Sequence, residues 1–209
     1  MPPKPKTQDQ RDQLRSSIID AARELFVARG VDAVTMREIA KMIGYSPTAL
    51  YLHFADKEAI LRAVCDTDFL ALAQVLKDIF EIPDPIVRLN TFAQGYAQFA
   101  LSHPNHYRLM FMTPRPDCDP QTSSIQQGNP EQDAYAQLKE LVRLAFVAGC
   151  FRDELKDTEL IVQTIWAGIH GVCSGQIALA NNSWVNWKPV EDRLALMQDI
   201  LIRGLIKAV

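Results

Sequence analysis

The sequence predicts an all-α protein in which an N-terminal three-helix domain precedes a larger helical domain, with about nine helices in total. Two observations lead to this prediction. Nearly every segment repeats its apolar residues at three- and four-residue spacing, which places them on one face of a helix. No segment sustains the alternation of apolar and polar residues, rich in β-branched side chains, that half-buried strands show.

The first helix is expected over residues 10–29 and ends at Gly30. Its apolar positions share one face, at Leu14, Ile18, Ala21, Ala22, Leu25 and Phe26. Residues 1–9 are polar and contain Pro and Lys, so we expect them to form a flexible arm.

A helix-turn-helix is predicted between Thr35 and His53. Thr35 and Glu38 have the spacing of a capping box, in which each side chain bonds the other residue's backbone amide. Gly44 then supplies a turn conformation that most residues resist. Ser46 and the following proline restart the helix as N-cap and first helical residue. A helical hairpin that only packs within a bundle is the alternative interpretation.

Longer helices are expected to follow, over residues 56–80, 85–101, 104–111, 131–148, 158–180 and 190–207. Residues 112–130 are rich in Pro, Gly, Ser, Asp and Gln and are predicted to be the one long loop. The predicted division is an arm (1–9), a helix-turn-helix domain (10–55) and a larger helical domain (56–209), whose expected roles in binding DNA, a ligand and a second chain follow from the residues below.

Charge is distributed unevenly along the chain. Residues 1–62 hold ten Lys/Arg and eight Asp/Glu, a net charge of +2, whereas the remainder holds 12 basic and 17 acidic residues, a net charge of −5. A polyanion would therefore be attracted by the first third of the chain and repelled by the rest.

Composition argues against several classes of protein. Apolar stretches are interrupted well before the ~20 residues of a membrane span, and the N-terminus lacks the apolar core of a secretory signal. Four scattered cysteines indicate reduced thiols and a cytoplasmic protein. His103 and His106 are expected to mark a helix start and a surface position, so neither a metal nor a cofactor is predicted. Nucleophile and phosphate-loop motifs are missing from the sequence, which argues against an enzyme.

The second short helix should present small, hydroxylated or aromatic side chains outward, suited to thymine methyls and base edges in a major groove. These outward positions are Pro47, Thr48, Ala49, Tyr51, Leu52 and His53.

The stretch from Arg15 to Arg62 resembles the DNA-binding signature of the TetR family of bacterial regulators. The resemblance rests on Ala21-Ala-Arg-Glu-Leu-Phe26, Thr35-Met-Arg-Glu-Ile-Ala40, Gly44-Tyr-Ser-Pro-Thr-Ala-Leu-Tyr-Leu-His-Phe54 and Lys57-Glu-Ala-Ile-Leu61. It implies phosphate contacts from Thr35, Thr48, Tyr51, His53 and Lys57. It also implies groove-facing or groove-adjacent positions at Ser46, Pro47, Ala49 and Leu52. Tyr45 stands where the family often has a small aliphatic residue, and we expect it to add a contact to DNA.

The C-terminal part is similar to one TetR subgroup through Trp166-Ala-Gly-Ile-His170-Gly171 and through the His103–Phe111 stretch. Trp166 and His170 are four residues apart and share a helix face, where they either line a cavity or belong to the core. The other candidate effector-binding residues form an apolar, aromatic set: Cys65, Phe69, Phe92, Tyr96, Phe99, Tyr107, Met110, Phe111 and Cys173. Such a set suits a lipophilic or aromatic effector.

The last two long helices are expected to form a homodimer. Their apolar positions exceed the need of one small core: Ile161, Ile165, Ile169, Val172, Leu194, Met197, Ile200, Leu201 and Leu205. The family resemblance implies a four-helix interface between two chains, and two paired heads would bind a palindromic operator. Trp184 and Trp187 are assigned to the dimer rim or to a surface patch.

The expected function is therefore transcription regulation, most simply repression that a small effector relieves. A redox-responsive regulator using Cys150 or Cys173, an activator and a ligand-independent regulator remain as alternatives on the same fold.

Overall fold

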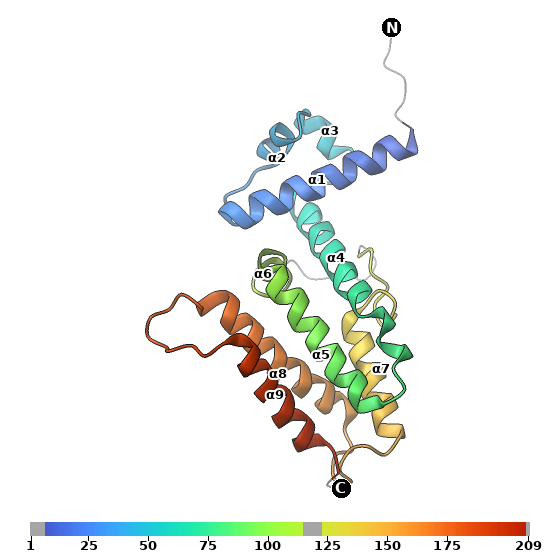
Figure 1. Ribbon diagram of the computed structural model, residues 1–209. Helices are drawn as coiled ribbons and strands as arrows, with labels where there is room; N and C mark the ends of the chain where they lie inside the picture. Colours follow the sequence, from blue (N-terminus) through green and yellow to red (C-terminus); the bar gives the residue numbers. More distant parts are fainter. Residues whose placement is uncertain (1–6, 115–122, 208–209) are drawn as a thin grey trace. The chain divides into compact units, whose positions relative to one another are not determined.

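The computed structural model describes residues 7–114 and 123–207, whose regular structure is almost entirely helical (Figure 1). Its helices are α1 (Gln8–Arg29), α2 (Met36–Met42), α3 (Pro47–Tyr51), α4 (Lys57–Val75), the 3-10 helix η1 (Lys77–Glu81), α5 (Pro85–Ser102), α6 (Pro104–Phe111), α7 (Ala134–Val147), α8 (Thr158–Leu179) and α9 (Val190–Leu205). No strand forms in these two ranges, where an isolated β-bridge joins Phe151 to Ile206. The predicted fold class is confirmed.

The chain divides into two compact units. One comprises residues 1–68 and 108–124, and the other comprises residues 69–107 and 125–209. The first unit thus continues past the predicted boundary at residue 55 into α4. Residues 1–6 of the predicted arm, the middle of the predicted 112–130 loop and Cys118 lie outside the described residues.

Helix α1 begins earlier than the sequence led us to expect. The Thr7 hydroxyl accepts a hydrogen bond from the Gln10 amide (3.4 Å), and the Gln10 side chain accepts one from the Thr7 amide (3.1 Å). Gln8 and Asp9, which we assigned to the arm, are therefore helical, because this capping box satisfies amides that a helix start leaves unpaired.

The core of the first unit forms where α1 to α4 present their apolar faces. Its fully buried side chains include Ile18, Phe26, Ile39, Leu50 and Ile60. Ala40, also buried, is a small side chain on the first of the two short helices. Leu25, on the predicted apolar face of α1, is only half-buried, as is Ile43.

Two helices are shorter than predicted. Helix α3 ends at Tyr51, because the amides of His53 and Phe54 both bond the Leu50 carbonyl (2.8 and 2.9 Å) and close a tight turn. Helix α4 ends at Val75 and gives way to the tighter η1, where the Leu76 and Ile79 amides bond the carbonyls three residues earlier.

In the second unit, α5 packs against α7, α8 and α9, and α8 packs against both α7 and α9. Gly168 on α8 lies close to α9, since a Cβ there would lie 3.0 Å from Leu201 Cδ1 and 3.1 Å from Met197 Sδ. The buried Gln137 amide donates to the Ala73 carbonyl (3.0 Å). Among the described residues, no helix combines the length and the apolar character that a membrane span needs.

Candidate functional site

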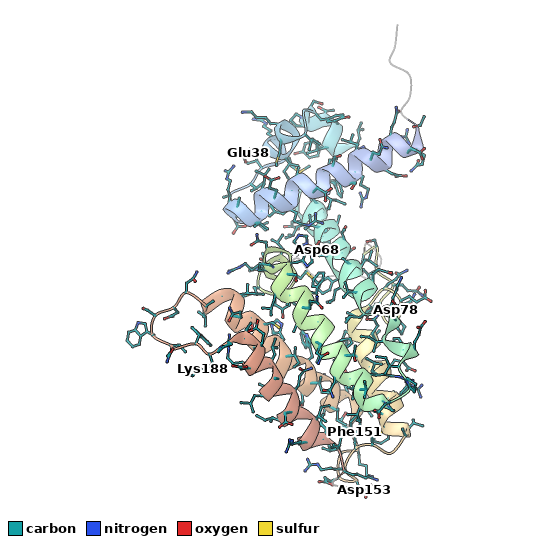
Figure 2. The ribbon with its side chains drawn as sticks, viewed as in Figure 1. Glu38, Asp68, Asp78, Phe151, Asp153 and Lys188 are labelled. Atoms are coloured by element: carbon teal, nitrogen blue, oxygen red, sulfur yellow. The ribbon has the colours of Figure 1, made fainter. Side chains whose placement is uncertain are left out.

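The turn between α2 and α3 has the geometry that the sequence predicts. Thr35 caps α2: its hydroxyl accepts from the Glu38 amide (3.3 Å), and the Glu38 carboxylate accepts from the Thr35 amide (2.8 Å). Gly44 adopts a φ of 72°, which L side chains rarely tolerate, and the next amide, of Tyr45, bonds back to the Ala40 carbonyl (2.9 Å). Glu38 appears in Figure 2 beside this helix pair.

Helix α3 is anchored on one side and open to solvent on the other. Leu50 is fully buried, and Phe54 just after the helix is buried as well. On the opposite side, Tyr51 is 55% exposed and Leu52 is 83% exposed. The other predicted DNA-binding residues of this segment are exposed at Tyr45, Ser46 and Thr48, and half-buried at Pro47, Ala49 and His53. The helix therefore presents an uncharged surface built of small, hydroxylated and aromatic groups.

Two predicted phosphate contacts already have partners within the chain. The Thr35 hydroxyl donates to the Glu38 carboxylate (2.8 Å) while it caps α2. The Lys57 ammonium donates to the Val31 carbonyl (2.7 Å) and lies 3.4 Å from the Asp32 carbonyl oxygen. An ammonium has three donors, so only part of the Lys57 hydrogen-bonding capacity is left for a phosphate.

Arg15 and Arg23 stabilise this unit in ways that periodicity did not reveal. The Arg15 guanidinium lies 4.3 Å from the centre of the Phe54 ring and donates to the His53 carbonyl (3.4 Å), so it holds the end of α3. Arg23 on α1 bonds Asp68 on α4 through Nε (3.1 Å) and a terminal nitrogen (3.0 Å). Asp68 is 2% exposed, and Figure 2 labels it on α4.

The second unit contains a hydrogen-bonded group of four aromatic side chains, here called the aromatic quartet: Tyr96, Tyr107, Trp166 and His170. Trp166 Nε1 lies 3.2 Å from the Tyr96 hydroxyl, which lies 2.8 Å from the Tyr107 hydroxyl. The Tyr107 oxygen lies 2.5 Å from His170 Nδ1. Helices α5, α6 and α8 thus bring together four of the predicted effector-binding residues. Sequence spacing linked only Trp166 and His170.

One hydrogen bond of the quartet has a direction that chemistry imposes. An indole nitrogen can only donate, so Trp166 donates to Tyr96. His170 Nδ1 lies close to both tyrosine hydroxyls, 2.5 Å from Tyr107 and 3.2 Å from Tyr96, and the tautomer of a neutral His170 decides whether this nitrogen accepts or donates. Burial lowers the pKa of His170 and raises the pKa of Tyr96 to about 12, so all four groups are uncharged near neutral pH.

A pH dependence follows from the lowered pKa of His170. The unfolded chain takes up this proton first as the pH falls, so folding stability should be constant above about pH 6.5 and decline below it, towards the lowered pKa. Asparagine at position 170 offers an acceptor without a titratable group. We expect His170→Asn to remove this part of the decline in urea unfolding measured between pH 7.5 and 5.

Histidine-ring nitrogen NMR supplies an independent check on the same histidine. We expect a neutral ring at pH 7, because burial lowers the pKa of His170. A protonated ring at pH 7, or an unchanged pH profile in His170→Asn, would contradict this expectation.

The remaining predicted effector-binding residues are distributed over both units. Phe92, Phe99 and Cys173 are buried and Phe69 is half-buried in the second unit, whereas Cys65, Met110 and Phe111 belong to the first. The Cys65 thiol lies 3.6 Å from the Leu109 carbonyl oxygen. Burial raises the pKa of Cys173 to about 12, so this thiol stays protonated and is a poor candidate for the reactive group of a redox sensor.

Two surface clefts in the described part of the second unit are lined by none of the predicted effector-binding residues. One, of about 450 Å³, lies between α7 and α8, where Tyr135 donates to Glu159 (2.6 Å). Its charged side chains pair with each other, Lys139 with Glu159 (3.0 Å) and Arg143 with Glu140 (2.7 Å). The other, of about 410 Å³, is formed by α5 and α9 and is here called the α5–α9 groove.

The apolar residues expected at a dimer interface divide into three groups by burial, of which the half-buried group is Val172, Leu194, Met197 and Leu201. Ile161, Ile165, Ile169 and Leu205 are buried within the single chain, so they serve its own core and our assignment of them to the interface is wrong. Ile200 is exposed as expected, together with Leu160 and Leu196, which the sequence did not single out. Periodicity locates the apolar faces of a helix but does not separate a face buried in the chain from one left for a partner.

Sequence comparison finds matches in both parts of the chain. Residues 18–64 match the family described as "Bacterial regulatory proteins, tetR family", and residues 89–184 match the "Tetracyclin repressor-like, C-terminal domain". The HTH-type transcriptional regulator SrpR of Pseudomonas putida is 44% identical over 59 residues, which cover 28% of this chain. The same match spans 28% of the length of SrpR, less than a third of that relative.

Solved structures resemble nearly the whole chain. A protein with unknown function from Rhodococcus sp. RHA1 has a TM-score of 0.74 at 24% identity, covering 99% of this chain and 100% of that one. SmeT, the repressor of the Stenotrophomonas maltophilia multidrug efflux pump SmeDEF, has a TM-score of 0.65 at 22% identity, covering 92% of this chain and 90% of SmeT. At these identities the likeness establishes the fold.

Proposed function

Because the chain belongs to the TetR family of bacterial regulatory proteins, we propose that it is a sequence-specific transcriptional repressor that binds operator DNA as a homodimer. The observation that supports this most strongly is the geometry of α2, its glycine turn and α3. Leu50 anchors α3, while the exposed side of the segment is uncharged and suited to base edges and thymine methyls. Positions 45–49, 51–53, 35 and 57 are the proposed DNA-binding residues.

We further propose that a small effector binds the protein and releases it from DNA. The aromatic quartet supports a site in the second unit for a small lipophilic or aromatic molecule, because it combines aromatic surface with uncharged hydrogen-bonding groups. SmeT is named as a repressor of a multidrug efflux pump, which is consistent with such an effector here.

Release is proposed to occur by a population shift. The division between the two compact units falls within α4, so this helix belongs to both. An effector that binds better to one arrangement of α4 disfavours the arrangement that DNA requires. By linkage, the effector must then bind more weakly to the DNA-bound protein than to the free protein. Equal affinities would contradict this mechanism.

Selection of bound duplexes from a random DNA library tests the proposed function. The full chain is used at two salt concentrations, since phosphate contacts alone give binding that weakens steeply with salt. We expect recovery of a palindrome with fixed half-site spacing at both concentrations. Recovery of salt-sensitive duplexes without a common motif would contradict sequence-specific regulation.

A further inference from the structure

The connection between α8 and α9 exposes a large apolar side chain. Trp184 is 94% exposed and its neighbour Val185 is 46% exposed. Figure 1 shows this connection extending away from the helices that it joins. Tryptophan is a frequent anchor of protein interfaces, because its large apolar surface is stabilised by burial. A tryptophan that is almost wholly exposed to water lacks this stabilisation.

The connection is held in a defined conformation. The Trp184 amide bonds the Asn182 side chain (2.9 Å), and the Trp187 amide bonds the Val185 carbonyl (2.9 Å). Arg193, in the second turn of α9, lies 4.8 Å from the centre of the Trp187 ring and donates to the Lys188 carbonyl (3.1 Å). Lys188 is labelled in Figure 2 at the end of the connection. Trp184 is therefore presented from a fixed support, which lowers the entropic cost of docking.

The α5–α9 groove has the size and chemistry to receive an indole. Its volume is about 410 Å³, and its walls combine the apolar side chains Ala97, Leu101, Leu194 and Ala195 with glutamine and serine side chains that can accept from an indole N–H. Glu191 is the charged residue among its lining, and Lys188 is the charged residue of the connection, so the two surfaces have opposite charges.

The arrangement of these two features favours a second copy of this chain as the partner. The connection directly precedes α9, and the groove is lined by the first half of the same helix, so both lie at one end of α9. A two-fold axis near that end would place each Trp184 in the groove of the other chain, and the contact would be made twice.

The surface area that such a contact would bury also favours a second copy of this chain as the partner. Two buried tryptophans supply up to ~500 Å², about a third of the ~1,600 Å² of a standard interface. The exposed Leu196 and Ile200 on α9 offer apolar surface towards the rest. We propose that Trp184 of each chain docks into the α5–α9 groove of a second copy. This inference rests on the dimer of the proposed function and specifies how its rim is built.

Photo-crosslinking tests the docking directly. p-Benzoylphenylalanine replaces Trp184 in the full chain, and ¹⁴N- and ¹⁵N-labelled chains are mixed so that mass spectrometry separates crosslinks between chains from those within one. We expect crosslinks between chains to peptides covering residues 94–102 or 191–198. Crosslinks confined to other segments, in a sample that sediments as a dimer, would overturn the proposal.

Sedimentation equilibrium gives the energetic test. Trp184→Ala should raise the dimer dissociation constant by about 100-fold or more, because an interface anchor is lost twice per dimer. Ala195→Glu, which places a larger and charged side chain in the α5–α9 groove, should raise the dimer dissociation constant similarly. Val147→Ala, exposed at the end of α7, is the control and should leave it unchanged.

The outcomes separate this proposal from the proposed function. An unchanged dissociation constant in Trp184→Ala, with a dimer that still binds its palindrome, overturns the docking and leaves the regulator intact. A wild-type chain that stays monomeric at all concentrations contradicts both.

Discussion

We expect Leu52→Glu to lower the affinity for the selected operator by about 1,000-fold while the protein stays folded. Leu52 is 83% exposed, so the substitution removes little packing and should change the free energy of unfolding by less than ~0.5 kcal/mol. At the proposed interface, the new carboxylate would face the phosphates of each half-site. A loss of ~2 kcal/mol of binding free energy at each of the two half-sites corresponds to this 1,000-fold factor.

The matched control introduces the same charge far from α3 in the sequence. Val147→Glu changes a residue that is 72% exposed at the end of α7, and we expect its operator affinity to match that of the wild type. Fluorescence anisotropy with labelled operator measures both variants. Wild-type affinity in Leu52→Glu would show that this side of α3 does not face DNA.

The second large effect concerns the Arg23–Asp68 ion pair. Asp68→Ala should lower the free energy of unfolding by about 3 kcal/mol, because it leaves the mostly buried Arg23 guanidinium with the exposed Asp20 carboxylate, 2.7 Å away, as its remaining ion-pair partner. The Arg23 side chain is 13% exposed and Asp68 is 2% exposed, so water replaces little of the lost interaction. Urea unfolding followed by circular dichroism measures the change.

A double variant separates the loss of the pair from the loss of packing. Arg23→Met combined with Asp68→Leu removes both charges and keeps apolar volume at both positions. We expect it to recover most of the stability that Asp68→Ala loses, since buried ion pairs are often replaceable by apolar groups at little cost. A single variant that unfolds like the wild type would mean that this pair contributes nothing to the fold.

The helical fold and the helix-turn-helix could be predicted because local signals determine them. Capping residues such as Thr35 and Ser46 act on amides three residues away, and Gly44 acts on its own φ angle. The start of α7 was misplaced by three residues, because Asp133, which accepts from the Tyr135 and Ala136 amides, was not recognised as its cap.

Contacts between segments that are distant in the sequence could not be predicted. Tyr96 and Tyr107 both bond His170, although they precede it by 74 and 63 positions in the sequence. Arg23 and Asp68, which bond each other, are 45 positions apart. Helical periodicity shows which face is apolar, yet it contains no information on which other helix covers that face. For this reason, Trp166 and His170 were paired correctly on α8, while Ile161 and Ile165 were wrongly assigned to the dimer interface.

Two copies of this chain are proposed to bind one palindromic operator. The most direct test measures stoichiometry and affinity on the selected duplex and on the same duplex with one half-site scrambled. We predict two chains on the intact palindrome and a loss of affinity of at least ~100-fold on the single half-site, because each half contributes several kcal/mol. Binding of one chain with equal affinity to both duplexes would contradict the claim.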